Sequence, residues 1–384
     1  MTAATMPEDR AKRDPFGACV ADERGDLDNA QFAETVLAVA AVLAAAGLGP
    51  GDVLAIALPN QVEFVTCMFA AWRLGAAVTP IDPALSAREA RYRIDDAAVA
   101  MIVADEAAAR KLRDAGRPIV ALRDVVSPAV PEAGVPISAT PDSLALLLYA
   151  DGTTGVMLDH ANLTQAAERI ADWYAMDRDT GCLLVLPLSG VGQIVLSVVA
   201  PLLAGGSTFI AGQFDPDRFW ATVERARPTY LVAGHGVCAP LVARPGGPSE
   251  TQFLQYVISV AAPMPAQLAA EFEWRHGVPV IDGFGPAECA GCCTANPPYG
   301  IRKPGTAGLP LPGVDVGVVD SRGQLLPAGV AGEVIVRGSN VMRGYLGRPA
   351  ETARALHGGW LRTGAVGRFD QDGYLMLARP RQSR

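Results

Sequence analysis

The sequence alternates short apolar runs with longer segments of helical periodicity, and this alternation constrains the fold more than any other feature. Residues 52–58 read Asp-Val-Leu-Ala-Ile-Ala-Leu, and residues 77–81 and 101–104 are similar runs without a polar face. Between them, residues 61–74 and 88–97 have apolar side chains at helical spacing. Strands that lack a polar face and alternate with helices are typical of a parallel sheet covered on both sides. The sequence therefore predicts an α/β fold.

The alternation recurs twice before the composition changes. Further rounds run over residues 143–209 and 216–282, whereas residues 305–373 are rich in Gly and Val and contain short alternating strands. A chain of 384 residues is long enough for roughly two or three cores.

These patterns predict three parts. We expect a flexible N-terminus over residues 1–15, two α/β subdomains over residues 16–300, and a smaller β-rich subdomain over residues 301–384.

The charge pattern excludes some partners. The net charge is −8, there is no basic cluster, and lysine occurs only at Lys12, Lys111 and Lys303. This argues against nucleic acid or an anionic membrane surface as the main partner. Residues 181–214 lack charge but are broken by Pro and Gly, so the stretch near residues 193–203 is predicted as a buried core helix and not a membrane span.

The seven cysteines lack the spacing of a secreted disulfide framework, and the N-terminus has no apolar signal segment. We therefore expect a cytoplasmic protein with reduced thiols. Cys289, Cys292 and Cys293 cluster, but no second group of Cys or His has ligand spacing, so zinc is not predicted.

A candidate phosphate loop follows an apolar strand in the middle of the chain. Residues 146–155 read Leu-Leu-Leu-Tyr-Ala-Asp-Gly-Thr-Thr-Gly. Glycines allow backbone N–H groups to turn toward an anion, and the hydroxyls add donors. A plain turn is the alternative interpretation of this pattern.

This loop, continued by residues 156–163, resembles the phosphate loop of the adenylate-forming superfamily, the AMP-dependent synthetases and ligases that include acyl-CoA synthetases. Similar motifs follow in the family's order at residues 259–263, 282–288, 308–313, 332–345, 359–364 and 372–379. The resemblance implies the N-terminal core of an adenylate-forming enzyme, with two stacked, mostly parallel α/β subdomains and a smaller β-rich subdomain.

The resemblance also implies a chemistry. These enzymes join a carboxylate to ATP, form acyl-AMP and pyrophosphate, and usually pass the acyl group to a thiol. The implied cofactors are ATP or AMP with Mg²⁺, and CoA or a carrier thioester. The implied partners are a small carboxylate or acyl thioester, and a carrier protein or a separate catalytic domain.

Site residues carry over position by position. The nucleotide and phosphate residues implied by the resemblance are Thr153, Thr154, Gly155, Ala262, Phe284 and Arg379. The implied acyl pocket comprises Ser189, Gly190, His235, Val260 and Gly285. Glu288 is the implied catalytic carboxylate and, if ATP binds, the Mg²⁺ ligand.

The sequence departs from the family pattern at chemical positions. The loop has no lysine after Gly155, which is followed directly by Val156, and Asp151 stands where a serine is usual. Ala365 replaces the aspartate that grips ribose, Ala287 replaces the motif threonine, and Ser189-Gly190 replaces an aromatic-His pair. The chain ends near the family's hinge, so we expect the C-terminal lysine-bearing lid domain to be absent. We identify no arginine that replaces either lysine.

Three functional hypotheses stay open. The first is an acyl-CoA ligase-like protein that binds a carboxylate or acyl thioester with weak or absent adenylation, as a pseudoenzyme would. The second is an atypical ligase completed by a partner domain. The third is a repurposed enzyme that acts on a thioester or carboxylate in the same pocket.

The third hypothesis would use Cys289 as nucleophile and His235 as base, with Asp282 or Asp151 orienting the histidine. The alternative is that Cys289 is a small buried residue. The other histidines are predicted to be structural, with His160 packed beside the loop and His276 and His357 at the surface or at helix ends.

Overall fold

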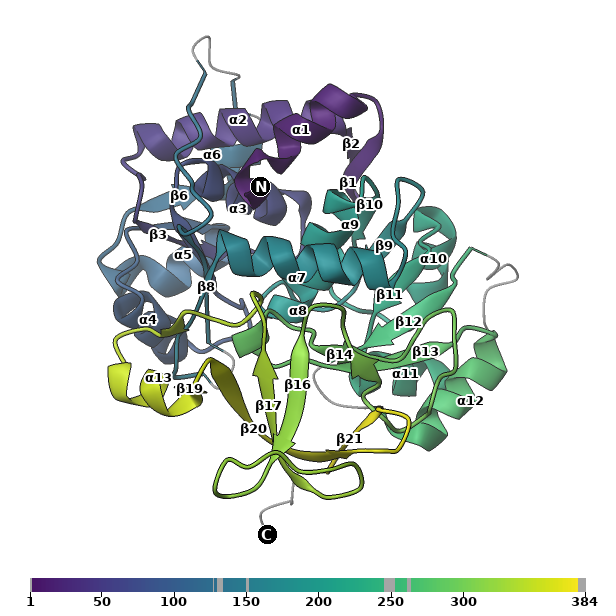
Figure 1. Cartoon of the computed structure of the whole chain (residues 1–384). Helices are drawn as coiled ribbons and strands as arrows, with labels where there is room; N and C mark the ends of the chain where they lie inside the picture. The colour runs from purple at the N-terminus through teal and green to yellow at the C-terminus, as the bar shows by residue number, and fades with distance from the viewer. Residues whose placement is uncertain are drawn as a thin grey trace.

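The computed structural model describes residues 2–126, 128–129, 134–149, 152–244, 253–260 and 264–378. In these residues the chain builds two α/β layers with a β-rich sheet below them (Figure 1). This arrangement confirms the predicted fold class.

The first layer is a seven-stranded sheet with a parallel centre. Its strands in spatial order are β18 (Gly344–Tyr345), β8 (Val156–Asp159), β7 (Leu144–Leu148), β4 (Ala77–Pro80), β3 (Val53–Ala57), β5 (Met101–Ala104) and β6 (Ile119–Ala121). Only the pairings of β8 with β7 and β18 are antiparallel.

The second layer is a nine-stranded sheet whose centre is also parallel. Its strands in spatial order are β15 (Leu309–Pro310), β14 (Thr294–Ala295), β13 (Val280–Phe284), β12 (Tyr256–Ser259), β11 (Tyr230–Val232), β9 (Gly181–Leu184), β10 (Ser207–Ile210), β1 (Ala18–Asp22) and β2 (Asp26–Asp28).

The third sheet is antiparallel and lies toward the C-terminus. It comprises β16 (Asp315–Val319), β17 (Gly332–Arg337), β20 (Trp360–Phe369), β19 (Leu356–His357) and β21 (Leu375–Leu377). Val318, Val334 and Leu375 form its small core together with Phe284 from the second layer.

Helices flank the two large sheets. They are α1 (Met6–Arg13), α2 (Asn29–Ala45), α3 (Val62–Arg73), α4 (Ala87–Asp96), α5 (Glu106–Leu112), α6 (Leu122–Val126), α7 (His160–Trp173), α8 (Val191–Ile194), α9 (Ala200–Leu203), α10 (Phe219–Ala226), α11 (His235–Val242), α12 (Ala266–His276) and α13 (Pro349–Ala355). Shorter helical segments are η1 (Ala3–Thr5), η2 (Arg113–Ala115), η3 (Val195–Val199) and η4 (Ala287–Cys289).

Local sequence explains several helix starts. The side chains of Asp28, Ser86 and Asp159 each accept a hydrogen bond from the backbone N–H three residues later. The side chain of that later residue in turn accepts a hydrogen bond from the backbone N–H of the capping residue. Such capping boxes satisfy N–H groups that a helix start would leave unpaired. The box at Asp159 fixes where β8 ends and α7 begins, directly after the candidate phosphate loop.

The N-terminal segment, for which we expected flexibility, contains the helix α1. Arg10 on α1 is 5% exposed and donates to the backbone carbonyls of Ala18, Leu202 and Gly206 and to the side chain of Asn29. One buried guanidinium therefore holds α1 against the second layer. Sequence patterning missed this because the relevant carbonyls lie far along the chain.

The expected boundaries also differ from the sheet boundaries. Strands β1 and β2 belong to the second layer, although the chain then builds the first layer before it returns. From the C-terminal region, β15 extends the second layer and β18 closes the edge of the first. The β-rich part thus contributes strands to both layers.

The apolar stretch near residues 193–203 is a continuous helical segment made of α8, η3 and α9. Within it Ile194, Leu196 and Val198 are completely buried, which confirms the predicted core helix. Among the described residues, no helix has the length and hydropathy that a membrane span requires. This segment packs against α7, and their apolar cluster joins the two layers.

Candidate functional site

The candidate site lies where the carboxyl ends of parallel strands from the two layers meet. Asn60, which follows β3, donates to the Leu186 carbonyl at 2.9 Å and accepts from the Leu188 N–H at 3.0 Å. Ser189, which follows β9, donates to a carboxylate oxygen of Asp82 beyond β4 at 3.3 Å. Ligands of open α/β sheets bind in such crevices at the carboxyl ends of strands.

The candidate phosphate loop connects β7 to β8. Gly152 has φ of +86°, a conformation that side chains rarely adopt. A Cβ on Gly155 would lie 3.1 Å from Leu147 and 3.3 Å from Leu346, so this position is closely packed. Val156 follows at once and pairs with Leu148. The loop therefore passes directly from Gly155 into the β-ladder.

Contacts from distant segments hold this short loop. The carbonyl of Thr153 accepts from the Tyr92 hydroxyl at 2.8 Å and from the Arg348 guanidinium at 3.2 Å. The carbonyl of Gly155 accepts from the Leu346 N–H at 2.8 Å. Nothing in the sequence pattern indicated this arginine, because 195 residues separate Arg348 from its partner Thr153.

A tyrosine at the start of the loop adds a second anchor on α4. Tyr149 donates to the Asp96 carboxylate at 2.8 Å, and the Arg93 guanidinium lies 5.6 Å from the Tyr149 ring centre. Burial and the Asp96 carboxylate raise the pKa of Tyr149, so its hydroxyl stays a hydrogen-bond donor at neutral pH.

Glu288 lies on η4, beside the strand that pairs with β8. Its carboxylate accepts from the Tyr345 hydroxyl at 2.9 Å, and its backbone carbonyl accepts from the Met342 N–H at 2.7 Å. Tyr345 in turn pairs with Val156 at the end of the loop. Residues 342–345 therefore connect the candidate metal ligand to the candidate phosphate loop.

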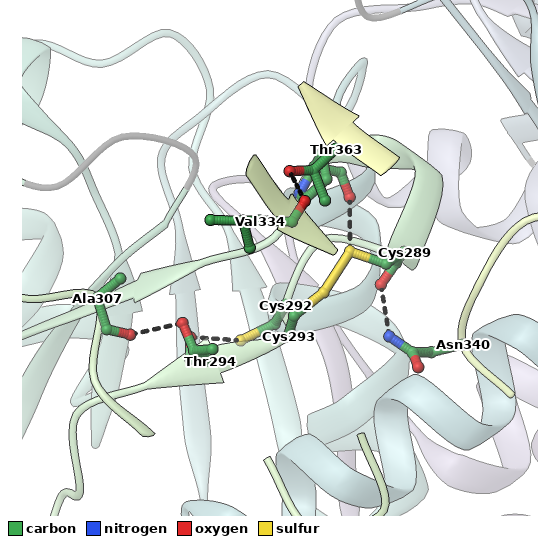
Figure 2. The surroundings of a disulfide bond; sticks show 9 residues. Cys289, Cys292, Cys293, Thr294, Ala307, Val334, Asn340 and Thr363 are labelled. Carbon is green, nitrogen blue, oxygen red and sulfur yellow. Dashed lines mark hydrogen bonds between the residues drawn. A yellow bond between two sulfur atoms is a disulfide. The ribbon is translucent and has the colours of Figure 1, made fainter. Parts of the chain in front are cut away.

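Cys289 and Cys293 are joined by a disulfide (Figure 2). This corrects the expectation of reduced thiols, and it means that Cys289 has no thiol for the predicted nucleophilic role. The Cys289 carbonyl accepts from the Asn340 amide at 3.0 Å, while the Cys292 thiol points to the Thr294 carbonyl at 3.6 Å. The bond closes residues 289–293, which directly follow Glu288, into a ring.

The proposed Cys-His-Asp arrangement gains no support from the described contacts. His235 is exposed at the start of α11, and Cys289 is completely buried. Asp282 is 4% exposed, and burial raises its pKa to about 6. Its carboxylate accepts from the Met264 N–H at 3.0 Å. Within the described ranges, no hydrogen bond links any two of these three residues.

The residues expected around the acyl group pack closely. A Cβ on Gly291 would lie 2.9 Å from Gly192, and a Cβ on Gly285 would lie 2.3 Å from the backbone N of Cys292. A Cβ on Gly192 would lie 3.5 Å from Val260. These backbone contacts bring α8, β12 and the segment after β13 together.

Gly190 precedes α8, and a Cβ there would lie 2.1 Å from the Gln193 amide oxygen. A larger residue here would require a new rotamer of the flexible Gln193 side chain. Ser189 and Gly190 thus form a tight turn in place of the bulkier pair of the related motif.

The positions expected to hold the nucleoside lie toward the β-rich sheet. Phe284 is 6% exposed and packs with Val318, Val334 and Leu375. Ala365 packs against the same cluster, and its backbone N–H donates to the Thr363 hydroxyl at 3.2 Å. Alanine offers no side-chain acceptor for ribose hydroxyls.

The described residues fit only part of an ATP–Mg²⁺ group. Glu288 offers one carboxylate, but no group of three or more His, Cys, Asp or Glu capable of holding a metal occurs in the described ranges. Ala365 provides no ribose acceptor, and the loop has no lysine directly after Gly155.

Three expected positions lie outside the described residues, namely Asp151, Ala262 and Arg379. The three remaining histidines are described. His160 is buried, with its ring 5.5 Å from that of Trp72. His276 ends α12 but is 5% exposed and packs between Trp220 and Phe272, so it is not a surface residue. His357 is exposed on β19.

Comparisons with known proteins agree with this geometry. Residues 7–346 match the family described as AMP-binding enzyme. The chain is 30% identical to an oxalate–CoA ligase from Arabidopsis thaliana, over 86% of this chain and 69% of that protein. It is 32% identical to a sulfoacetate–CoA ligase from Cupriavidus necator, over 87% of this chain and 69% of that protein.

The crystal structure of ATP-bound MatB from Rhodopseudomonas palustris is similar throughout. The TM-score is 0.88 at 28% sequence identity, and the match covers 98% of this chain and 78% of the other. The fold, the ordered motifs and the extent of the family match lead to one conclusion. The chain belongs to the AMP-binding enzymes of the adenylate-forming superfamily and is acyl-CoA ligase-like.

Proposed function

We propose that this protein binds a carboxylate or its acyl thioester in the crevice between the two layers, and that ATP-dependent adenylation by this chain is weak or lost. The observation that carries the proposal is the direct passage of the loop from Gly155 into β8. The Val156–Leu148 pairing and the bond from Leu346 to Gly155 leave no lysine-bearing segment between loop and strand.

The magnitude of this change supports the proposal. Phosphoryl and adenylyl transfer depend on cations placed at the developing negative charge. Removal of one preorganised group of this kind lowers the rate about 10²–10³-fold. Ala365 adds a second loss at the position where the related motif has an acidic side chain. Either change alone would slow an enzyme that acts on ATP.

The close packing of Gly192, Gly285 and Gly291 supports a short acid as the bound group. The relatives are named for short acids, such as oxalate and sulfoacetate, and also for bulkier ones, such as ferulate and indoleacetate, so the choice rests on this packing. We therefore propose a short, anionic carboxylate as the ligand.

The test is pyrophosphate release from ATP with oxalate, sulfoacetate and, as a bulky comparison, benzoate. The oxalate–CoA ligase serves as the positive control. We expect rates at least about 100-fold below that control. Calorimetric titration with the same acids should show binding of oxalate or sulfoacetate without ATP. A pyrophosphate rate within about tenfold of the control would refute the proposal.

A gain-of-function variant sharpens this test. Ala365→Asp restores a carboxylate for the ribose without altering the loop. It should strengthen binding of AMP but leave pyrophosphate release low, because the loop still lacks its lysine. Ala353→Asp on exposed α13 is a control for the added charge. Full activity of Ala365→Asp would mean that the loop is competent, which contradicts the proposal.

A further inference from the structure

The ring closed by the Cys289–Cys293 disulfide contains a backbone conformation that is unusual for its residue type. Ala290 has φ of +56° and Gly291 has φ of +89°. Glycine adopts such left-handed angles freely, whereas a residue with a Cβ is disfavoured there about tenfold. A left-handed residue of this kind persists only where the surrounding structure enforces it. Ala290 is therefore a strained residue inside a covalent ring.

Hydrogen bonds to other segments fix the two ends of the ring. At the first end, the Asn340 amide donates to the Cys289 carbonyl at 3.0 Å (Figure 2). At the second end, the Cys293 N–H donates to the Phe284 carbonyl at 2.7 Å, and the Cys293 carbonyl accepts from the Leu311 N–H at 2.9 Å. The middle of the ring can therefore change its conformation while both ends stay in place.

The middle of the ring contacts α8. A Cβ on Gly291 would lie 2.9 Å from the Cα of Gly192, so the two backbones touch. Glu288, directly before the ring, accepts from the Tyr345 hydroxyl at 2.9 Å. The ring therefore joins α8, which follows Ser189 at the crevice, to the segment that carries the candidate metal ligand.

We propose that the Cys289–Cys293 bond is a redox-controlled clamp. In the oxidised chain the bond holds Ala290 in its left-handed conformation and Gly291 against α8, and reduction by a small dithiol releases both. The inference goes beyond the proposed function and does not rest on it, because it concerns the geometry beside the crevice and not the ligand or the reaction there.

The redox step is an ordinary thiol–disulfide exchange. One thiolate of the dithiol attacks one sulfur of the bond, a mixed disulfide forms, and the other cysteine leaves as a thiolate and takes up a proton. The second thiol of the reductant then attacks the mixed disulfide, closes the reductant's own disulfide and frees the remaining cysteine. Two electrons and two protons pass from the reductant to the protein, and an oxidised dithiol reverses the step.

Cys292, inside the ring, does not replace the external reductant. Its thiol points to the Thr294 carbonyl at 3.6 Å, and burial raises its pKa to about 12. Such a thiol is protonated at neutral pH, whereas only a thiolate attacks a disulfide. Cys289 and Cys293 are completely buried, so a reductant reaches the bond during local opening of the segment. This burial favours a small dithiol over a protein as the reductant.

The probe is dithiothreitol, added to the folded full chain, with its oxidised form to reverse the reaction. Alkylation and mass spectrometry give the state of Cys289 and Cys293, and amide hydrogen exchange of residues 286–293 reports release of the ring. Cys293→Ser imitates the reduced state. The matched control is Cys292→Ser, which keeps a donor toward Thr294 and leaves the bond intact. Ala290→Gly tests the strain, because glycine adopts the left-handed angle without a steric cost.

We expect reduction to speed amide exchange of residues 286–293 about tenfold, which is the bias against a left-handed alanine, while β4 exchanges at an unchanged rate. Cys293→Ser should exchange fast without reductant, and Cys292→Ser should respond to dithiothreitol as the wild type does. In Ala290→Gly the difference between the oxidised and the reduced chain should fall to about threefold or less.

Three results would overturn the inference. The first is equal exchange of the oxidised and the reduced wild type, a test that stands even where Cys293→Ser does not fold. The second is reduction of the bond only as fast as β4 exchanges, because such a bond opens only with global unfolding. The third is a full redox response of Ala290→Gly, because strain at Ala290 would then not drive the release. None of these results bears on pyrophosphate release or acid binding, so the proposed function is tested separately.

Discussion

The replacement of His160 by phenylalanine should remove a pH-dependent loss of stability. His160 is completely buried at the first position of α7, and its ring packs edge-on against Trp72. Within the described ranges, neither ring nitrogen has a hydrogen-bond partner. Burial lowers the pKa of this imidazole from 6.5 to about 4. Phenylalanine keeps an aromatic ring beside Trp72 but does not titrate.

The sign follows from the lower pKa in the folded state. Above pH 6.5 the histidine is neutral in both the folded and the unfolded state, so the free energy of unfolding does not depend on its protonation. As the pH falls, the unfolded chain binds a proton first, so stability is lost between pH 6.5 and about 4. At pH 5 the loss relative to neutral pH is about 2 kcal/mol, from the two pKa values.

The assay is urea unfolding at pH 7 and pH 5 for the wild type and His160→Phe. The free energy of unfolding should fall less in the variant between these pH values, by about 2 kcal/mol. His235→Asn is the control, because His235 is exposed on α11. Equal pH dependence of the wild type and His160→Phe would refute the reasoning.

Three further outcomes are expected. Arg10→Met should lower the free energy of unfolding by at least about 3 kcal/mol, because several buried carbonyls lose a charged donor. Urea unfolding measures this loss of stability. A loss below about 1 kcal/mol would contradict the expectation. Asp159→Ala removes the cap of α7 and should cost about 1 kcal/mol in the same assay, whereas an unchanged midpoint would argue against the capping box. Thiol titration of unreduced, unfolded protein should find two fewer reactive cysteines than after reduction, because Cys289 and Cys293 are bonded; equal counts would exclude the bond.

Much of the fold could be predicted because local patterns report it directly. The apolar runs at residues 77–81 and 101–104 became parallel strands β4 and β5, since strands without a polar face must be covered on both sides. The motifs that follow one another in the family's order identified the superfamily, because their glycines and turns occur at set positions of a single fold.

The candidate site was only partly predictable. The absence of a loop lysine directly after Gly155 is visible in the sequence, but the position of Arg348 beside Thr153 is not. The same holds for His276, which ends a helix and lies under Trp220 because of how α10 and α12 pack. Buried aromatic contacts of this kind depend on which helices meet.

The sequence alone determined the α/β class, the superfamily and the missing lysine and aspartate, because these are properties of residue type and spacing along the chain. Only the tertiary structure decided which groups surround the loop. Tyr92 on α4 and Arg348 before α13 meet at the Thr153 carbonyl because β18 pairs with β8 at the edge of the first layer. Such a meeting joins segments far apart in the sequence, and no local pattern encodes it.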